Sequence, residues 1–126
     1  SRLRPDRMTL HCQQCSAVWG DSFSICGEVR SMDSIVCLSE FISLLGCRGW
    51  NCTSCLTIYS ALKCRGCCCA VGKVIHSAPW RLASVRSMFL LHKANTSCIL
   101  SSLMQGYCCL HERLLYECCP SYKVLD

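Results

Sequence analysis

Short apolar segments separated by polar or turn-forming residues run through most of the chain. Several are rich in β-branched or aromatic residues and are bounded by Gly, Ser, Asp or Asn: 8–12, 23–26, 35–38, 56–59, 71–75 and 97–100. Segments of this length and composition are typical of β-strands. The pattern therefore predicts a mainly β domain built from antiparallel sheet.

Gly, Asp and Pro residues predict where these strands stop. Residues 18–21 are expected to form a turn after the first strand, with Gly20 and Asp21 as the turn residues. Residues 44–50 contain two glycines and are expected to form a loop between the two halves of the domain. Pro79 should end the strand that precedes it, because proline cannot donate to a sheet ladder.

The period of the apolar residues changes near the C-terminus. Leu103, Tyr107, Leu110 and Leu114 are spaced by four, three and four residues, which predicts a short amphipathic helix that ends before Pro120. A helix interrupted by glycine at position 106 is marginal alone, since Gly costs on the order of 1 kcal/mol relative to Ala. We therefore expect it to pack on the domain.

The composition is that of one folded domain. The chain has 126 residues, of which 52% are hydrophobic and 17% are charged, whereas disordered chains are more polar and more charged. No apolar run approaches the roughly 18 residues that a spanning helix needs, so we expect no contact with a membrane. No signal peptide is recognisable at the N-terminus.

The charges are unevenly distributed. The formal net charge is only +5, but no carboxylate occurs between Phe41 and His111, while seven Lys and Arg residues fall there. A field of one sign attracts acidic partners. The sequence thus predicts either a weak contact of the 41–111 region with DNA or an acidic protein, or a solvated basic face without a dedicated partner.

Sixteen cysteines indicate either a disulfide framework in an oxidising compartment or thiolate metal ligands in a reducing one. Adjacent cysteines, which bond poorly to one another, occur at positions 67–69, 108–109 and 118–119. This spacing favours the reducing interpretation. The alternative is a secreted disulfide-bonded glycoprotein, because Asn51 and Asn95 each begin an N-glycosylation acceptor pattern.

Six cysteines form Cys-x-x-Cys pairs, which are Cys12/Cys15, Cys52/Cys55 and Cys64/Cys67. A two-residue spacer in a tight turn directs both sulfurs to one point about 2.3 Å away, and two such turns complete the tetrahedron of a zinc site. The spacing predicts one zinc ion and leaves several pairings open. Four thiolates would close the coordination shell, so the zinc should be structural and not catalytic.

Nothing in the sequence indicates catalysis. The four histidines, His11, His76, His92 and His111, lie outside any recognisable nucleophile signature. His11 lies next to the first Cys-x-x-Cys pair and is expected at the surface or beside the metal ligands. No glycine-rich phosphate loop is present, and the eight acidic residues lie near the two ends of the chain. We expect a protein that is not an enzyme.

Two stretches of the sequence resemble a known family. Residues 10–24 contain the first Cys-x-x-Cys pair followed by Gly-Asp-Ser, and residues 59–74 contain Lys-Cys-Arg-Gly-Cys followed by a strand with Val-Gly. This combination is similar to the Mis-eighteen centromere proteins, a branch of the yippee-like zinc fold. A proline-bearing turn at 77–80 and an apolar strand at 88–91 also match, so that the resemblance covers about residues 8–102.

The resemblance implies a yippee-like β-tent of two antiparallel sheets joined by one structural zinc, with a short C-terminal helix. It places the zinc ligands at Cys12, Cys15, Cys64 and Cys67. The zinc domain would span 8–102, between an N-terminal tail of 1–7 and a helix and tail of 103–126. Cys47, Cys52 and Cys55 match no ligand of the family, and Cys68 and Cys69 crowd the second pair.

The same resemblance implies a function. Mis-eighteen proteins are non-enzymatic scaffolds that prime centromeres for deposition of the histone variant CENP-A, through a binding partner and a histone chaperone. The chain would then be a nuclear, chromosomal and centromeric protein of the cell division cycle, acting as a homodimer or a heterodimer with a paralogue. The family's long coiled-coil helix has no counterpart here. A yippee-like adaptor or ligand-binding domain is the third alternative.

Overall fold

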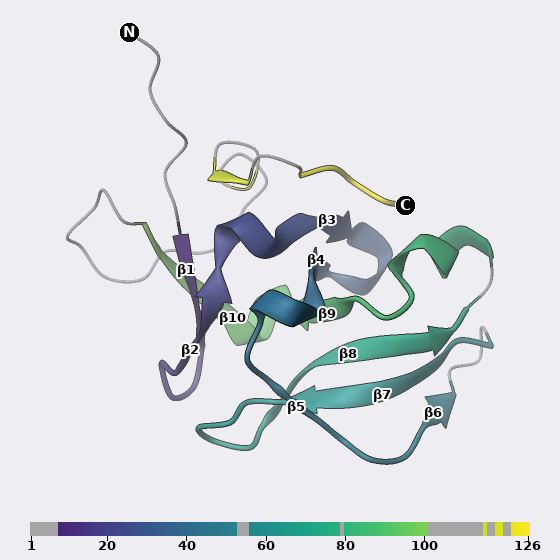
Figure 1. The fold of residues 1–126 in the computed structure, drawn as a ribbon, viewed down its shortest axis with the longest axis horizontal. Helices are drawn as coiled ribbons and strands as arrows, with labels where there is room; N and C mark the ends of the chain where they lie inside the picture. The colour runs from purple at the N-terminus through teal and green to yellow at the C-terminus, as the bar shows by residue number, and fades with distance from the viewer. Residues whose placement is uncertain (1–7, 53–55, 79, 101–114, 116–117, 120–121) are drawn as a thin grey trace, which may run out of the picture.

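The computed structural model describes residues 8–52, 56–78, 80–100, 115, 118–119 and 122–126 (Figure 1). Its strands are β1 (Met8–Cys12), β2 (Val18–Asp21), β3 (Ile25–Val29), β4 (Ser34–Cys37), β5 (Leu45–Gly46), β6 (Asn51–Cys52), β7 (Ile58–Lys63), β8 (Ala70–Ser77), β9 (Phe89–His92) and β10 (Thr96–Leu100). Its 3₁₀ turns are η1 (Ser22–Ser24), η2 (Arg30–Met32), η3 (Ser39–Phe41), η4 (Trp80–Val85) and η5 (Lys93–Asn95).

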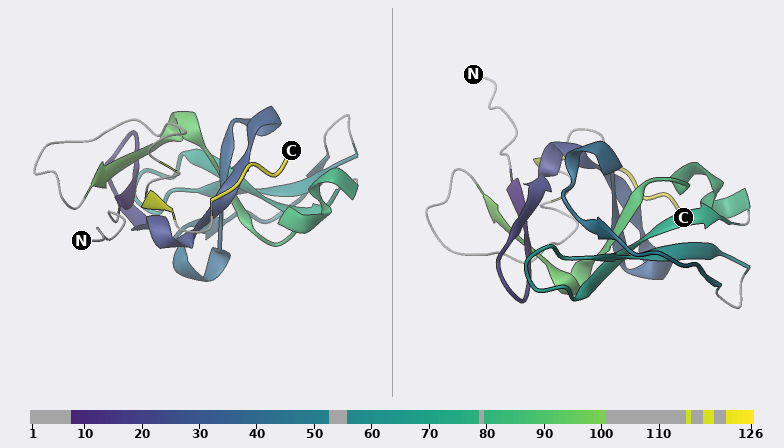
Figure 2. Two further views of the ribbon diagram at one scale, coloured as in Figure 1. Left: turned by 90° about the horizontal axis from the view of Figure 1, so that it is seen from above. Right: turned by 60° about the horizontal axis from the view of Figure 1, so that its bottom comes forward.

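The strands form two antiparallel sheets. The smaller sheet has the order β10-β1-β2, so that the two ends of the domain pair with each other. The larger sheet has the order β3-β4-β9-β8-β7-β5, and β6 also pairs with β7. Two further views show the small sheet at one end of the large one, from which the long β7–β8 hairpin extends (Figure 2). The fold is mainly β, as predicted.

Buried apolar side chains join the two sheets. The main cluster includes Leu10 and Trp19 from the small sheet and Ile35, Leu62 and Leu91 from the large one, each at most 2% exposed. A second cluster covers the opposite face of the large sheet: Val29, Val36, Ile75, Val85 and Leu90. The large sheet is therefore buried on both faces at β4 and β9, which explains why these strands read as apolar runs rather than as alternating ones.

Most of the predicted strands are present, some with shifted ends. The segment predicted at 23–26 begins later, because η1 occupies Ser22–Ser24 and β3 starts at Ile25. The segment predicted at 56–59 likewise starts at Ile58 and continues to Lys63. Within the predicted loop 44–50, Leu45 and Gly46 pair with β7 as the short strand β5. The strand before Pro79 ends at Ser77, as expected.

The turn predicted at 18–21 is wrong, since these residues form β2. Gly20 is needed for packing and not for a turn. A Cβ there would lie 2.6 Å from the carbonyl oxygen of Phe41 and 2.8 Å from Ile42 Cδ1. Asp21 ends the strand and caps η1, because its Oδ1 accepts a hydrogen bond from the Phe23 N–H at 3.0 Å.

Most of the predicted C-terminal helix, including its apolar positions from 103 to 114, lies outside the described residues. Leu115 and Cys118 have helical backbone, and the Cys119 N–H donates to the Leu115 carbonyl at 3.0 Å, which is a helical i to i−4 bond. Leu115 is fully buried in the main cluster. Within the described part of the chain, no helix has the length and apolar character needed to cross a membrane.

Candidate metal centre

Four thiols from two distant parts of the sequence lie together. Cys12 ends β1 and Cys15 lies in the turn that follows, while Cys64 and Cys67 lie in the turn between β7 and β8. Their sulfur atoms all lie within 4.8 Å of one another. The group connects the small sheet to the large one at the place where the β1–β2 and β7–β8 turns meet.

The two turns have the same backbone geometry. In the first, the Cys12 N–H donates to Ala17 O at 2.9 Å and the Ser16 N–H donates to Cys12 O at 3.0 Å. In the second, the Cys64 N–H donates to Cys69 O at 3.0 Å and the Cys68 N–H donates to Cys64 O at 2.9 Å. The second turn therefore repeats the first, as the sequence predicted.

Both turns place a non-glycine residue in the left-handed region directly after the second cysteine. Ser16 has φ of 66° and Cys68 has φ of 63°. A non-glycine residue in this region carries strain that the surrounding structure must offset. The equivalence with Ser16 gives Cys68 a place in the turn as the residue that reverses the chain, and its side chain is exposed.

The sulfur separations fit a tetrahedral zinc ion. Cys12 Sγ lies 3.7 Å from Cys67 Sγ, and Cys15 Sγ lies 3.6 Å from Cys64 Sγ. Sulfur atoms about 2.3 Å from a central zinc are about 3.8 Å apart at the corners of a regular tetrahedron. A disulfide would bring two sulfurs to about 2.05 Å. The cluster thus matches four thiolates around one metal ion, and zinc is the ion that prefers this donor set.

Neighbouring donors stabilise negative charge on one ligand in particular. Cys64 Sγ accepts hydrogen bonds from Trp19 Nε1 at 3.4 Å and from the Gly66 N–H at 3.3 Å. Desolvation raises the pKa of the Cys64 thiol, but the hydrogen bonds from the Trp19 side chain and the following backbone outweigh it and lower the pKa to about 6. A thiol of this kind is largely ionised at neutral pH, as a metal ligand must be.

Gly66 allows the two turns to approach each other. A Cβ at this position would lie 2.9 Å from Cys15 Sγ, 3.2 Å from the Ala17 Cβ and 3.6 Å from Cys64 Sγ. Two of these atoms belong to the first turn, so that a side chain here would push the turns apart. The requirement for glycine comes from a contact between segments about fifty positions apart in the sequence, which local spacing does not reveal.

Residues beside the cluster hold the first turn in place. His11 is 6% exposed, and its Nδ1 lies 3.2 Å from the Ser16 carbonyl oxygen, while its Nε2 lies 2.7 Å from Thr9 Oγ1. The histidine predicted at the surface or beside the ligands is therefore buried beside them.

Trp19 was not predicted to have a role at the site. An indole N–H directed at a thiolate leaves no signature in the sequence beyond a tryptophan four residues after the cysteine pair.

The other cysteines that the structure describes do not join the cluster. Cys52 lies exposed in β6, and Cys55 lies outside the described residues, so their pairing as a second half of the site receives no support. Cys69 donates from its Sγ to Gln14 Oε1 at 3.2 Å, across the two turns. Among the described residues, no two cysteines are joined by a disulfide bond. Burial raises the pKa of the Cys37 thiol far above its usual range, which keeps it protonated and unreactive.

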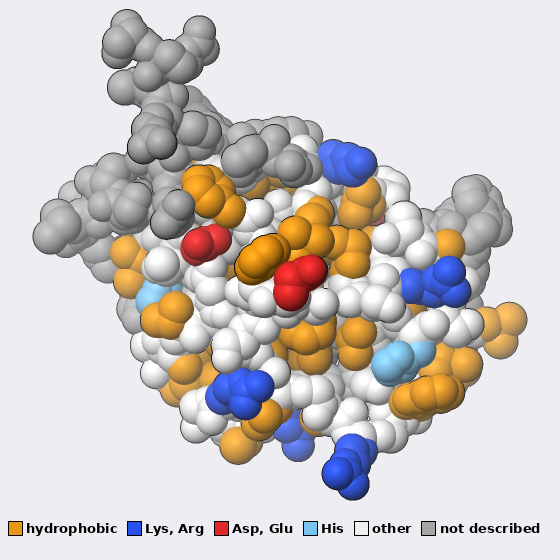
Figure 3. Space-filling model, in the orientation of Figure 1, with side chains coloured by type: hydrophobic (Ala, Val, Ile, Leu, Met, Phe, Trp, Pro, Cys, Tyr) orange, Lys and Arg blue, Asp and Glu red, His pale blue; other side chains and the backbone are white. Residues whose placement is uncertain are grey.

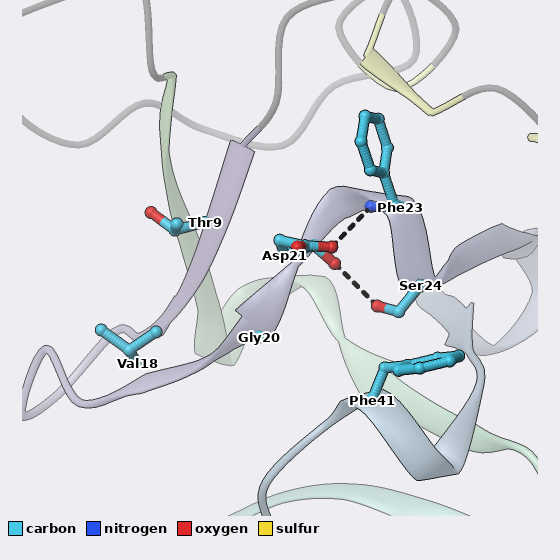
Figure 4. Close-up of a pocket in the computed structure, with 7 residues that line it drawn as sticks. All are labelled: Thr9, Val18, Gly20, Asp21, Phe23, Ser24 and Phe41. Carbon is cyan, nitrogen blue, oxygen red and sulfur yellow. Dashed lines mark hydrogen bonds between the residues drawn. The ribbon is translucent and has the colours of Figure 1, made fainter.

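A second candidate site is an open pocket of about 460 Å³ beside β2. Figure 4 shows the side chains of Val18, Phe23 and Phe41 around it, with Thr9 on β1 at its far side. Its acid, Asp21, already accepts the hydrogen bond that caps η1. Its hydroxyl groups are also engaged, because Thr9 Oγ1 lies 2.7 Å from His11 Nε2 and the Ser24 hydroxyl donates to the Asp21 carbonyl oxygen at 2.7 Å. The exposed side chains of Val18, Phe23 and Phe41 make the pocket suited to apolar contact.

These features define a class of protein. Two antiparallel sheets are joined by a pair of Cys-x-x-Cys turns whose four thiols fit one structural zinc. A family model described as Yippee zinc-binding/DNA-binding/Mis18, centromere assembly, matches residues 8–106. The chain therefore belongs to the Yippee/Mis18 family, and the resemblance seen in the sequence is confirmed.

Solved structures agree with this assignment. The crystal structure of a Mis18 Yippee-like domain is similar with a TM-score of 0.69 and 19% identity, covering 79% of this chain and 99% of that chain. The C-terminal domain of Caenorhabditis elegans Dicer-related helicase 3, in a structure with a 5′-ppp 8-mer single-stranded RNA, is similar with a TM-score of 0.56 and 16% identity, covering 94% and 69%. At these identities the similarity shows the fold. No curated protein sequence gave a significant match.

Proposed function

We propose that the protein is a non-enzymatic scaffold that acts at centromeres in the nucleus and primes them for CENP-A deposition through protein–protein contacts. The observation that carries the proposal is the match of residues 8–106 to a family described by zinc binding and centromere assembly. The family match extends slightly past the zinc domain that we place at 8–102. Since folds of one class host different functions, a yippee-like adaptor or ligand-binding domain is the competing assignment.

Within this proposal, Cys12, Cys15, Cys64 and Cys67 are the ligands of one structural zinc. Four thiolates leave no coordination position for water or substrate. The metal then joins the two sheets, because each sheet supplies one of the two turns. Function is expected on the surfaces of the sheets that the metal holds in place.

The pocket beside β2 supports a role in protein association. Val18 is 60% exposed, Phe23 45% and Phe41 62%, although large apolar side chains are usually buried. Figure 3 shows hydrophobic side chains gathered over the centre of this face, with acidic side chains among them and Lys and Arg toward the edges. Apolar patches rimmed by polar residues are typical of protein interfaces. We assign this patch to contact with a second copy of the chain or a paralogue.

A localisation experiment tests the proposal. The chain, tagged with a fluorescent protein, should gather at centromeres at a defined stage of the cell cycle and recover a centromere-priming partner and a histone chaperone on affinity purification. The variant Cys12→Ser should lose both properties, whereas Cys52→Ser, which alters an exposed cysteine away from the cluster, should keep them. Uniform distribution of the native chain throughout the cell cycle would contradict the centromere assignment.

A second candidate function is contact with nucleic acid. Arg48, Lys63 and Arg65 are exposed, and Trp50, 70% exposed, stacks on His76 with ring centroids 5.1 Å apart. An exposed aromatic ring is suited to stacking on a base, and exposed cations are suited to phosphate contacts. The family description includes DNA binding, and one structurally similar domain was solved with RNA. These observations favour the β5–β7 side of the large sheet as the contact.

Binding of labelled duplex DNA and of single-stranded RNA, each titrated over a range of salt concentrations, tests this candidate. Lys63→Ala should weaken binding and reduce the slope of log affinity against log salt concentration by about one, the value expected for one lost phosphate contact. Lys93→Ala is the matched control in charge, because Lys93 is already paired with the buried carboxylate of Glu28. Equal losses from both substitutions would argue against a specific contact and for net charge alone.

A further inference from the structure

The C-terminal segment (residues 123–126) lies against the outer edge of β3, the end strand of the large sheet. Figures 1 and 2 show this segment beside β3, although it is the part of the chain farthest from β3 in sequence. The Glu28 N–H donates to Lys123 O at 2.9 Å, and the Leu125 N–H donates to Glu28 O at 2.9 Å. The segment thus extends the edge of the sheet through one parallel β-bridge between Glu28 and Val124.

The edge of β3 has a feature that admits another backbone. A Cβ at Gly27 would lie 2.0 Å from the carbonyl oxygen of Lys123. Any side chain at this position would exclude the segment. Glycine in a strand often marks such a close approach of a second chain, where side-chain bulk would block it.

A pair of backbone N–H groups holds the acidic end of the segment. Asp126 Oδ1 accepts from the Arg30 N–H at 2.7 Å, and Oδ2 accepts from the Ser31 N–H at 2.8 Å. Both oxygens of one carboxylate are therefore recognised by consecutive backbone donors, which are charge-assisted hydrogen bonds. Leu125, the residue before it, packs on the apolar cluster of the large sheet that includes Val29.

We propose that the edge of β3 is a docking site for an extended peptide in which an aliphatic residue is followed by aspartate, and that residues 123–126 occupy it as an intramolecular competitor. Recognition combines strand addition at Glu28, the space above Gly27 and the two N–H groups that bind the carboxylate. The occupant in trans is a partner segment of the same chemistry, which gains the site when the C-terminal segment leaves. This inference does not depend on the centromere assignment.

The seated segment itself supplies the argument for this ligand. Lys123 and Asp126 are exposed and Val124 and Leu125 are only partly buried, so residues 123–126 lie on the surface of the domain, whereas Tyr122 before them is 8% exposed and belongs to the main cluster. The segment's interactions are those of a peptide ligand: two backbone bonds, one aliphatic contact and one carboxylate bound by backbone donors. A surface segment held this way can exchange with a competing peptide without opening the main cluster between the sheets.

The test uses the full chain with Leu125→Ser and Asp126→Ala, called here the released chain. The probe is the acetylated and amidated peptide Tyr-Lys-Val-Leu-Asp, whose only carboxylate is that of the aspartate side chain. Amide signals of Glu28, Arg30 and Ser31 are followed by NMR during titration. The released chain should bind the peptide about tenfold more tightly than the native chain, as expected if the native segment fills the site about 90% of the time.

Two matched controls make the result decisive. Gly27→Ala in the released chain should abolish binding, whereas Gly46→Ala, where a Cβ meets nothing within 4 Å, should leave it unchanged. Because Gly27→Ala could also disturb the sheet, a peptide with Ala in place of Asp is titrated into the unaltered released chain and should bind much more weakly. Equal affinity of native and released chains, or of the two peptides, would overturn the proposal. If the native chain formed dimers that dissociate on addition of excess peptide, the competing segment would come from a second chain. That result would overturn the claim that the competitor is intramolecular.

Discussion

The contact between the two cysteine turns can be tested by adding one methyl group. In Gly66→Ala the new Cβ would lie 2.9 Å from Cys15 Sγ and 3.2 Å from the Ala17 Cβ. Ordinary van der Waals contact begins near 3.4 Å, so the first turn must move by about half an ångström relative to the second. Zinc ligand distances tolerate about 0.2 Å. The displacement therefore exceeds what the four thiolates can absorb.

We expect Gly66→Ala to lower zinc affinity by about 10- to 100-fold, which is the usual effect of changing residues that orient metal ligands. This corresponds to roughly 1.4 to 2.7 kcal/mol. The apparent affinity is measured by competition with a chromophoric chelator at fixed pH, and the thermal midpoint is recorded with zinc in slight excess. The midpoint should fall as well, because zinc that binds only the folded state stabilises that state.

Gly46→Ala is the control for the general effect of replacing glycine by alanine. Gly46 lies in the short strand β5, and a Cβ there meets nothing within 4 Å. Its zinc affinity should equal that of the native chain. If Gly66→Ala retained native affinity, or if both variants lost the same amount, the close approach of the two turns would not govern metal binding and the reasoning would be refuted.

Three further predictions concern the metal and the thiols. Removal of zinc by a strong chelator should unfold the domain, because structural zinc contributes an apparent binding free energy of about 10 to 16 kcal/mol, about as much as a whole domain's stability. Unfolding is measured as loss of the β-sheet signal in circular dichroism, and an unchanged spectrum would contradict a structural role. Trp19→Phe, which removes the hydrogen bond to Cys64 Sγ, should lower zinc affinity about tenfold, measured by the same competition. In denaturant without reductant, thiol titration should find near 16 free thiols and atomic absorption one zinc per chain, while near zero thiols would support the secreted glycoprotein.

Strand positions could be predicted where the sequence pattern and the burial agree. The segments at 35–38, 71–75 and 97–100 are apolar and β-branched, and they became β4, β8 and β10. The pattern failed at 18–21, where Gly20 and Asp21 have the composition of a turn. Packing of the 41–42 backbone against β2 requires the glycine there, and such a contact between distant segments is invisible to local patterns.

Spacing alone predicted the kind of metal centre and left the pairing open, and the family resemblance supplied the pairing. Three Cys-x-x-Cys pairs are visible in the sequence, and the spacing of a pair says only that two sulfurs can face one point. The structure brings Cys12 and Cys15 to Cys64 and Cys67, and leaves Cys52 exposed on β6. Pairing depends on which turns meet in space, and the order of strands in the two sheets determines that.

By itself, the sequence determined the fold class, the short strands and the presence of thiolate turns, because these depend on local composition and on the spacing of neighbouring residues. Tertiary structure alone decided which turns meet in space, why position 66 is glycine, and that the C-terminal segment completes the edge of β3 beside Gly27. The physical reason is the same in each case. These features are contacts between segments far apart in the chain, and close packing, not local propensity, sets the distances between them.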